Sequence, residues 1–292
     1  MNTVFDVIIL GGGPAGAQCA LWLKMLGLNP AVVEINDSFG GLQRQNPYQN
    51  NWIVTSPYAQ TGVQTAIIMA DNMRQKNIDV FTKFTEQDIS REHGQFTVSG
   101  MVEGGQVSLS ARMLVVATGV RHRDGGLKRS ERIIIGTGRV IEGYDFSGLN
   151  VAILGGGDSA AENYPLIKLK AAKSVKMFAR NVRARQNLMY KIPKQNVICG
   201  AYDVDQSNIS VNGEEFDVLC VMYGWHPVNP LSEDIDCQMD GAGFFVTDQN
   251  ARTSNSNIYA IGECAGKMHP CVVTAMAEGV VAAKSIQSDF GI

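Results

Sequence analysis

Two glycine-rich stretches in this 292-residue chain have the spacing of nucleotide-binding turns. The first, VIILGGGPAG at residues 7–16, places Gly11, Gly13 and Gly16 between an apolar run and a helical segment. In such a turn the first glycine permits the tight bend. The second lets a pyrophosphate approach the backbone, and the third lets helix and strand pack closely. The phosphates then meet the positive end of the helix dipole, so this stretch predicts a dinucleotide site.

An acidic residue follows this turn at the distance expected for a ribose contact. Glu34 ends the predicted strand 31–34 and lies 18 residues after Gly16. A carboxylate in this position accepts hydrogen bonds from ribose hydroxyls. The glycines alone are a weak signal, but strand, helix and acid together make the pattern specific. The alternative is a tight turn that binds no ligand.

A second copy of the pattern, VAILGGGDSA at residues 151–160, begins 144 residues later. The strand after it, 174–179, ends in no acid, and Arg180 stands where a ribose-binding carboxylate is expected. A guanidinium there favours the 2′-phosphate of NADP over the free hydroxyl of NAD. A solvated basic loop is the alternative. The residues predicted to bind this second ligand are Gly155, Gly157, Asp158, Ser159, Arg180, Arg183 and Arg185.

The two copies predict an α/β fold of two Rossmann-like three-layer domains, the second inserted into the first. We expect one domain from residues 1–117 and 229–292, and an inserted domain of the NAD(P)-binding type from residues 118–228. Helices are predicted at 61–76 and at 271–288. Pro165 lies inside the helix after the second turn and should kink or shorten it.

Charge is distributed unevenly along the chain. Residues 118–195 contain 15 of the 25 Lys and Arg residues but 6 of the 28 Asp and Glu residues. This segment therefore has a net charge of +9, and the rest of the chain has −12. Such a division indicates an anionic partner for the middle segment, unless the clustering is random.

Composition argues against several classes of protein. No apolar run is long enough for a membrane span, and the chain begins without a basic secretory segment, so a cytoplasmic protein is expected. None of the six cysteines forms a C-x-x-C pair. No metal-ligating cluster and no nucleic-acid pattern is written in the sequence. His93 and His122 lie in polar stretches and are expected at the surface.

The chain resembles the low-molecular-weight thioredoxin reductases over essentially its full length. The resemblance lies in GGGPAG (11–16), Glu34, GG (40–41), NNW (50–52), VVATG (115–119), GGGDSAAE (155–162), YAIGE (259–263) and the closing helix with Thr274 and Gly279. It implies FAD in the first site and NADPH in the second. It also implies a homodimer.

The resemblance extends to individual FAD contacts, although Glu263 stands where the family usually has Asp. The residues that it implies for FAD are Gly11, Gly13, Pro14, Ala15, Gly16, Glu34, Gly41, Leu42, Asn51, Ala117, Thr118, Gly119, Gly262, Glu263, Cys271 and Val272.

One departure from the family concerns the redox-active cysteines. The family has C-x-x-C-D-G a fixed distance before the second turn, and the corresponding residues here are GRVIEG at 138–143. Gly138 and Ile141 replace the two cysteines, and Glu142 follows them. A dithiol relay needs two sulfurs and a low-pKa thiolate, so the usual thioredoxin reductase chemistry is not expected.

The sequence therefore predicts a FAD-dependent NAD(P)H oxidoreductase whose acceptor is not an internal disulfide. Ferredoxin–NADP reductases of the thioredoxin-reductase type also lack the pair, which makes a small acidic electron carrier a plausible acceptor beside a small molecule. The alternatives are a flavoenzyme without pyridine nucleotide and a flavin-binding sensor. The sequence identifies no catalytic residue outright; the candidates are Cys271, His269 and Glu142. Cys271 is expected to tune the flavin or to pack, and a bridge to Cys264 is possible.

Overall fold

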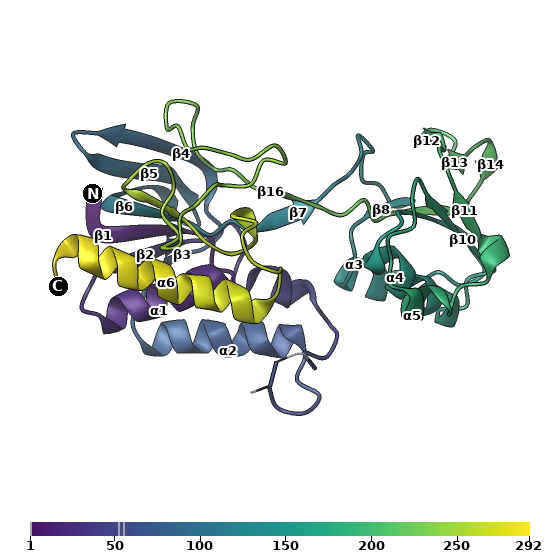
Figure 1. The fold of residues 1–292 in the computed structure, drawn as a ribbon, viewed down its shortest axis with the longest axis horizontal. Coiled ribbons are helices and arrows are strands. Elements are labelled where there is room, and N and C mark those ends of the chain that lie inside the picture. Colours follow the sequence, from purple (N-terminus) through teal and green to yellow (C-terminus); the bar gives the residue numbers. More distant parts are fainter. Residues whose placement is uncertain (1, 52, 55) are drawn as a thin grey trace. The chain divides into compact units, whose positions relative to one another are not determined.

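The computed structural model describes residues 2–51, 53–54 and 56–292 and divides the chain into two compact units. The first unit comprises Met1–Val120 and His226–Ile292, and the second comprises Arg121–Trp225. These limits lie three residues from the predicted ones. The chain leaves the first unit through β7 (Val120–His122) and returns through β16 (Trp225–Pro227) (Figure 1). Among the described residues, no helix is both long and apolar enough to cross a membrane.

The first unit is built on a parallel sheet in the order β3–β2–β1–β6–β17. Its central strand ends in the apolar run Val7–Leu10, which is buried, as expected for a parallel strand covered on both faces. The strands are β1 (Asn2–Leu10), β2 (Pro30–Val33), β3 (Asp79–Phe81), β6 (Gly105–Val116) and β17 (Ile258–Ala260).

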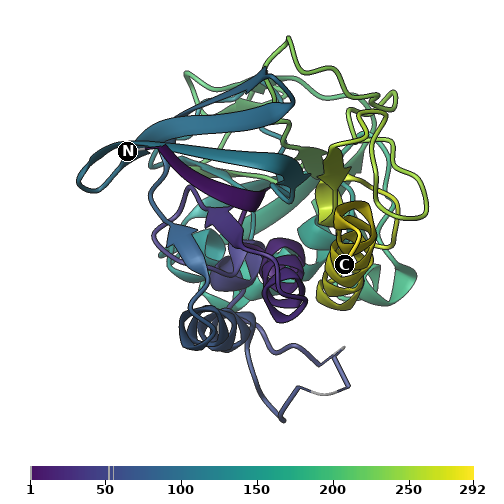
Figure 2. The same ribbon diagram turned by 90° about the vertical axis from the view of Figure 1, so that its left-hand side faces the viewer.

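The long strand β6 belongs to two layers. Its first residues pair antiparallel with β5 (Gln95–Val102), which pairs with β4 (Thr85–Glu92). Its last residues pair in parallel with β17. Figure 2 shows the resulting three layers, with helices on one side of the parallel sheet and the β4–β5 strands on the other.

Three helices cover the sheet of the first unit, and local signals explain where they begin. α1 (Pro14–Met25) starts after Gly13 with a proline in its first turn. α2 (Gly62–Gln75) starts with a capping box between Thr61 and Gln64. α6 (Val272–Phe290) is capped by Cys271 and ends at Gly291 in the left-handed conformation. The predicted helices 61–76 and 271–288 match these limits closely. Two 3₁₀ turns adjoin these helices: η1 (Gly41–Gln45) contacts α2, and η3 (Gly262–Cys264) contacts α1 and α6.

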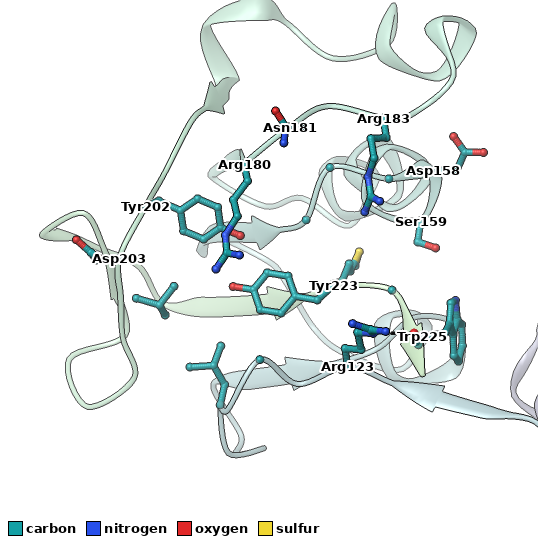
Figure 3. A pocket seen from close by; sticks show the side chains of 18 residues that line it. Arg123, Asp158, Ser159, Arg180, Asn181, Arg183, Tyr202, Asp203, Tyr223 and Trp225 are labelled. Carbon is teal, nitrogen blue, oxygen red and sulfur yellow. Dashed lines mark hydrogen bonds between the residues drawn. The ribbon is translucent and has the colours of Figure 1, made fainter. Parts of the chain in front are cut away.

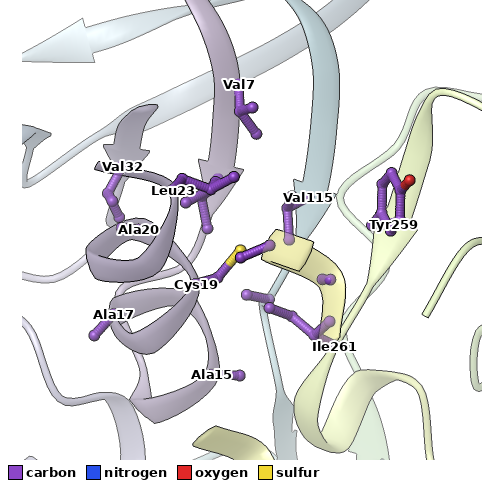
Figure 4. Close-up of a cluster of buried hydrophobic side chains, with 14 of the residues drawn as sticks. Val7, Ala15, Ala17, Cys19, Ala20, Leu23, Val32, Val115, Tyr259 and Ile261 are labelled. Carbon is purple, nitrogen blue, oxygen red and sulfur yellow. The ribbon is translucent and has the colours of Figure 1, made fainter. Parts of the chain in front are cut away.

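Small residues let α1 and α6 approach each other closely where both pack on the parallel sheet of the first unit. Alanines of α1 and Cys19 lie among Val7, Leu23 and Val115 (Figure 4). A Cβ atom on Gly279 of α6 would lie 2.5 Å from the Ala15 carbonyl oxygen and 2.9 Å from the Cys19 nitrogen. Burial raises the pKa of the Cys19 thiol, so this cysteine serves as a small apolar residue.

The second unit is a smaller three-layer domain. Its five-stranded parallel sheet runs β11–β10–β9–β15–β8. One face packs on helices and the other on a three-stranded antiparallel sheet. The parallel strands are β8 (Ile133–Ile135), β9 (Asn150–Leu154), β10 (Ser174–Ala179), β11 (Val197–Cys199) and β15 (Val218–Val221). The helices are α3 (Arg139–Glu142), α4 (Asp158–Leu169) and α5 (Gln186–Met189), with the 3₁₀ turn η2 (Lys194–Asn196). The small sheet is β12 (Val204–Asp205), β13 (Ser210–Val211) and β14 (Glu214–Glu215).

The predicted α/β class is confirmed, and the helix after the second turn is not shortened at Pro165. α4 continues through this proline as one helix of 12 residues, the same length as α1. Tyr164 and Ile167 on either side are buried against the sheet, and the Tyr164 hydroxyl accepts a hydrogen bond from Asn196 at 2.6 Å. This packing outweighs the cost of about 3 kcal/mol for an interior proline.

Substitution of Gly279 tests the close approach of α1 and α6. We expect Gly279→Val to lower the free energy of unfolding by about 2–3 kcal/mol, because the new side chain would overlap backbone atoms of α1 that cannot move aside singly. Urea denaturation measures the change. The matched control is Ala277→Val on the exposed face of the same helix, which should cost about 0.5 kcal/mol. Equal losses for the two variants would contradict this packing.

Candidate dinucleotide sites

The three glycines of the first turn have different surroundings. Gly11 has a φ of +109°, and a Cβ on it would lie 2.4 Å from the Ala117 carbonyl oxygen. A Cβ on Gly16 would lie 2.0 Å from the Gly11 oxygen. A Cβ on Gly13, the N-cap of α1, has no neighbour nearer than Gly41 Cα at 4.0 Å. Gly11 and Gly16 are therefore required by the fold, whereas Gly13 leaves open space at the start of the helix.

The predicted ribose acid lies beside this turn. Glu34 is 3% exposed, and its carboxylate accepts hydrogen bonds from the Gly12 amide at 2.7 Å and from the Asn36 amide at 2.8 Å. The Asn36 side chain donates a third at 2.6 Å. A carboxylate has about four acceptor sites, so Glu34 is fixed to the glycine turn and keeps capacity for one further donor.

Other predicted FAD residues gather around the same turn. The Gly40 amide donates to the Gly12 oxygen at 2.8 Å, which brings Gly41 and Leu42 to the turn at the start of η1. Ala117 is buried directly after β6 and donates to the Leu10 oxygen.

Two further stretches named for FAD contact other parts of the first unit. After Ala117, the Thr118 hydroxyl donates to the Val228 oxygen at 2.5 Å, and Gly119 follows with a φ of +65°. Asn51 is exposed, while its neighbour Asn50 is buried and donates to Gln43 and Thr65. Trp52 of the NNW motif lies outside the described residues.

A buried carboxyl near the start of α6 was missed by sequence reasoning. Glu278 is 7% exposed and accepts a hydrogen bond from the Gly262 amide at 2.5 Å through Oε2, but Oε1 has no partner among the residues that the structure describes. Burial raises the pKa of both Glu278 and Glu263. An isolated acid on the alanine-lined face of α6 is the signal that was overlooked. A ligand with hydroxyl donors would satisfy the free oxygen.

Cys271 caps α6 and is exposed, so it does not pack in the protein core. Its sulfur accepts a hydrogen bond from the Thr274 amide at 3.5 Å and lies 3.3 Å from the Thr274 hydroxyl. Partial burial opposes the thiolate, but these hydrogen bonds outweigh it and lower the pKa of Cys271. Cys264 is buried and all six cysteines are free, so the possible bridge is absent. His269 is exposed, and its carbonyl oxygen accepts from the Thr274 hydroxyl.

The second glycine turn opens on a cavity of about 700 Å³ in the second unit (Figure 3). Gly155 has a φ of +146°, and a Cβ on it would lie 2.2 Å from the Met222 oxygen. A Cβ on Gly157, the N-cap of α4, meets nothing within 4 Å. The turn thus repeats the arrangement of the first. Six of the seven residues predicted for the second ligand line the cavity: Gly155, Gly157, Asp158, Ser159, Arg180 and Arg183.

The seventh predicted residue, Arg185, is engaged elsewhere. Its Nε lies 2.8 Å from Asp158 Oδ2, its backbone amide donates to Asp158 Oδ1 at 2.8 Å, and a terminal nitrogen lies 3.2 Å from Glu162. Arg185 is not among the residues that line the cavity. In this structure the guanidinium is paired with two carboxylates and does not line the cavity.

Several residues that line the cavity come from segments without a local motif. They are Arg123, Asn181, Tyr202, Asp203, Tyr223 and Trp225. Burial raises the pKa of both tyrosines, and a Cβ on Gly125 would lie 2.5 Å from the Tyr223 ring. Figure 3 shows the Arg180 guanidinium beside the two tyrosine rings and Arg183 extending toward the glycine turn.

His122 was expected at the surface, and that expectation was wrong. Its ring stacks on Trp225 with centroids 3.6 Å apart. Burial, with a contribution from Arg129, lowers its pKa to about 4. His122 is therefore neutral near pH 7, and its ring packs against Trp225. His93 is exposed as predicted.

The segment that replaces the cysteine pair is folded into the second unit. Gly138 has a φ of +74° and caps α3. Ile141 is fully buried in the helical core, and Glu142 is exposed. None of the six cysteines lies in this segment.

Comparisons with known proteins agree with this architecture. A family model described as pyridine nucleotide-disulphide oxidoreductase matches residues 5–279. A ferredoxin–NADP reductase of Mycoplasmoides gallisepticum is 29% identical over 97% of this chain and 94% of that protein. A thioredoxin reductase of Mycoplasma genitalium is 24% identical over 99% and 96%. The crystal structure of T. acidophilum thioredoxin reductase covers 100% of both chains, with 22% identity and a TM-score of 0.79. The chain is therefore an oxidoreductase that belongs to the pyridine nucleotide-disulphide oxidoreductase family and has the thioredoxin reductase-like fold.

Proposed function

We propose that this protein is a FAD-dependent NAD(P)H oxidoreductase that passes electrons to an acceptor other than an internal disulfide. One observation carries the proposal. Each unit has a helix that begins at a glycine with open space in front of it, at Gly13 and at Gly157, and no cysteine stands at 138 or 141. Two dinucleotides fit these positions, while a dithiol relay has no sulfurs to use.

The residues of the first unit suit FAD. The amides at the start of α1 would hold its diphosphate, Glu34 would accept from the adenosine ribose, and Glu278 Oε1 would accept from a hydroxyl of the ribityl chain. When bound, FAD accepts two electrons at once and releases them singly or in pairs.

The residues of the second unit favour NADPH over NADH. Arg180 directly follows β10, where NAD-binding domains carry an acid, and both Arg180 and Arg183 line the cavity. Charge-assisted hydrogen bonds to a 2′-phosphate are worth roughly 1.5–3 kcal/mol each. A preference for NADPH follows if either arginine reaches that phosphate.

A small acidic electron carrier is the acceptor that the charge distribution favours. The basic segment 118–195, with its net charge of +9, would attract such a carrier and speed its association. The relative named ferredoxin–NADP reductase supports a carrier of this class. A homodimer in the cytoplasm is proposed on the family resemblance.

Two other functions are kept as outcomes of the tests below. One is a flavoenzyme that uses no pyridine nucleotide. The other is a flavin-binding sensor or interaction protein without turnover.

Anaerobic titration with NADPH tests the proposal. The purified protein should contain one FAD, and NADPH should bleach its visible absorbance faster than NADH does. No reduction of thioredoxin should accompany this, since no dithiol is present at 138–141. If neither nucleotide bleaches the flavin while dithionite does, one of the alternatives holds. Thioredoxin turnover at enzymatic rates would show that another cysteine pair acts.

Matched substitutions of the two open glycines separate the sites. We expect Gly13→Val to lose most of the FAD, because valine would occupy the space that the diphosphate needs. Gly157→Val should keep the FAD and lose NADPH binding. Flavin content per chain and calorimetric titration with NADP⁺ measure the two effects. Full FAD retention by Gly13→Val would contradict the assignment of the first site.

The low pKa of Cys271 predicts its reactivity. Alkylation by iodoacetamide requires the thiolate, so the rate at Cys271 should persist at lower pH than for an ordinary cysteine and should fall as pH drops through the lowered pKa. Thr274→Val removes one stabilising hydroxyl and should move this midpoint upward. Mass spectrometry of labelled peptides follows the rate, with the exposed Cys199 as the control.

Alkylation of Cys271 no faster than Cys199 would refute the predicted shift. Flavin reduction gives a second readout. Cys271→Ser should change the rate of NADPH-driven bleaching by less than about tenfold, or about 1.4 kcal/mol. A larger loss would make this thiol a redox participant.

A further inference from the structure

We infer that Arg185 supports nucleotide binding without touching the nucleotide, by neutralising the acids at the start of α4. This inference rests on the proposed nucleotide site of the second unit. It assigns Arg185 a positioning role shared by NAD and NADP, which differs from the 2′-phosphate contact that its place in the sequence predicted.

The two glycine turns differ in the charge at the helix start. α1 has no acidic residue in its first turn and begins with Pro14, whereas α4 begins with Asp158. A carboxylate at a helix N-terminus stabilises the helix by itself. It also lines the cavity, where it would repel the two negative charges of a diphosphate. The second turn therefore needs a compensating cation that the first does not.

Arg185 supplies that cation in a fixed position. It reaches Asp158 through both its backbone amide and its Nε, each at 2.8 Å, and Glu162 at 3.2 Å. Its own segment is bound to the glycine turn, because the amides of Arg183 and Ala184 both donate to the Gly156 oxygen, at 2.7 and 3.0 Å. The turn, the acids and the arginine thus form one connected arrangement.

The arrangement predicts which ligands respond to its loss. Without Arg185, the Asp158 carboxylate would lose its cation at the start of α4, where both NAD⁺ and NADP⁺ would place a diphosphate. Glu162 would keep its weaker interaction with Lys191. Adding or removing one charge next to a bound diphosphate changes the affinity for the nucleotide on the order of tenfold when solvent partly screens the charge. Arg180 differs, since its loss should weaken the binding of NADP⁺ more than that of NAD⁺.

The variants are expected to fold. The side chains of Asp158, Glu162 and Arg185 are 41%, 51% and 53% exposed, and exposed ion pairs contribute little to stability. Unfolding midpoints of every variant provide the check. If Arg185→Ala unfolds, Arg185→Gln keeps most of the side chain and replaces it.

Isothermal titration of the FAD-loaded protein with NAD⁺ and NADP⁺ provides the test. Arg185→Ala should weaken both by a similar factor of about ten, with a smaller loss at high salt. Arg180→Ala should weaken NADP⁺ more than NAD⁺. Adding Asp158→Asn to Arg185→Ala should restore most of the lost affinity.

Three results would overturn the inference: a loss confined to NADP⁺, no loss at all, or a double variant as weak as the single one. Failure of the wild-type protein to bind either nucleotide would instead refute the proposed site.

Discussion

The amides at the start of a helix have no partner inside the helix, and each unit of this protein begins a helix at a glycine, Gly13 or Gly157, whose Cβ position is open. The Cβ positions of Gly11, Gly16, Gly155 and Gly156 are instead blocked by backbone atoms. Helix N-terminal amides must find acceptors in a ligand, a side chain or water. The tight turns, the buried parallel strands behind them and the small residues between α1 and α6 keep each helix close to its sheet. The rest of each unit serves to hold these helix ends in place.

The two units differ in the charges placed around the same backbone. The first keeps its helix start free of acids and puts Glu34 at the end of the second strand, bonded to the glycine turn. The second puts Asp158 at the helix start and Arg180 at the strand end. Backbone geometry therefore provides for the diphosphate, which all dinucleotides share. The side chains at the strand end select between a free ribose hydroxyl and a 2′-phosphate on the nucleotide.

Much of the fold was predictable because its signals are local. Glycine spacing located both turns, apolar runs located the buried strands, and the domain limits fell within three residues of those observed. Sequence reasoning did not find the features that depend on contacts between residues far apart in the chain. Arg185 pairs with Asp158, which lies 27 residues earlier in the sequence. His122, near the beginning of the second unit, stacks on Trp225, the last residue of that unit. Pro165 lies within a continuous helix because its neighbours Tyr164 and Ile167 are buried against the sheet. Glu278 belongs to no sequence motif, and only the structure reveals that one of its oxygens lacks a partner within the described part of the chain.

The segment at 138–141 limits the ways in which this protein can be re-engineered. Its first position is a glycine at φ +74° and ψ −132°, a conformation in which any other residue would be strained by roughly 1–3 kcal/mol. Its fourth position, Ile141, is completely enclosed by the core, where a sulfur would be shielded from water and its thiolate disfavoured. Writing two cysteines back into these places would thus give one strained thiol and one inert one. A disulfide exchange centre in this protein would therefore require a different backbone around α3. Substitution of the two residues by cysteine would not suffice.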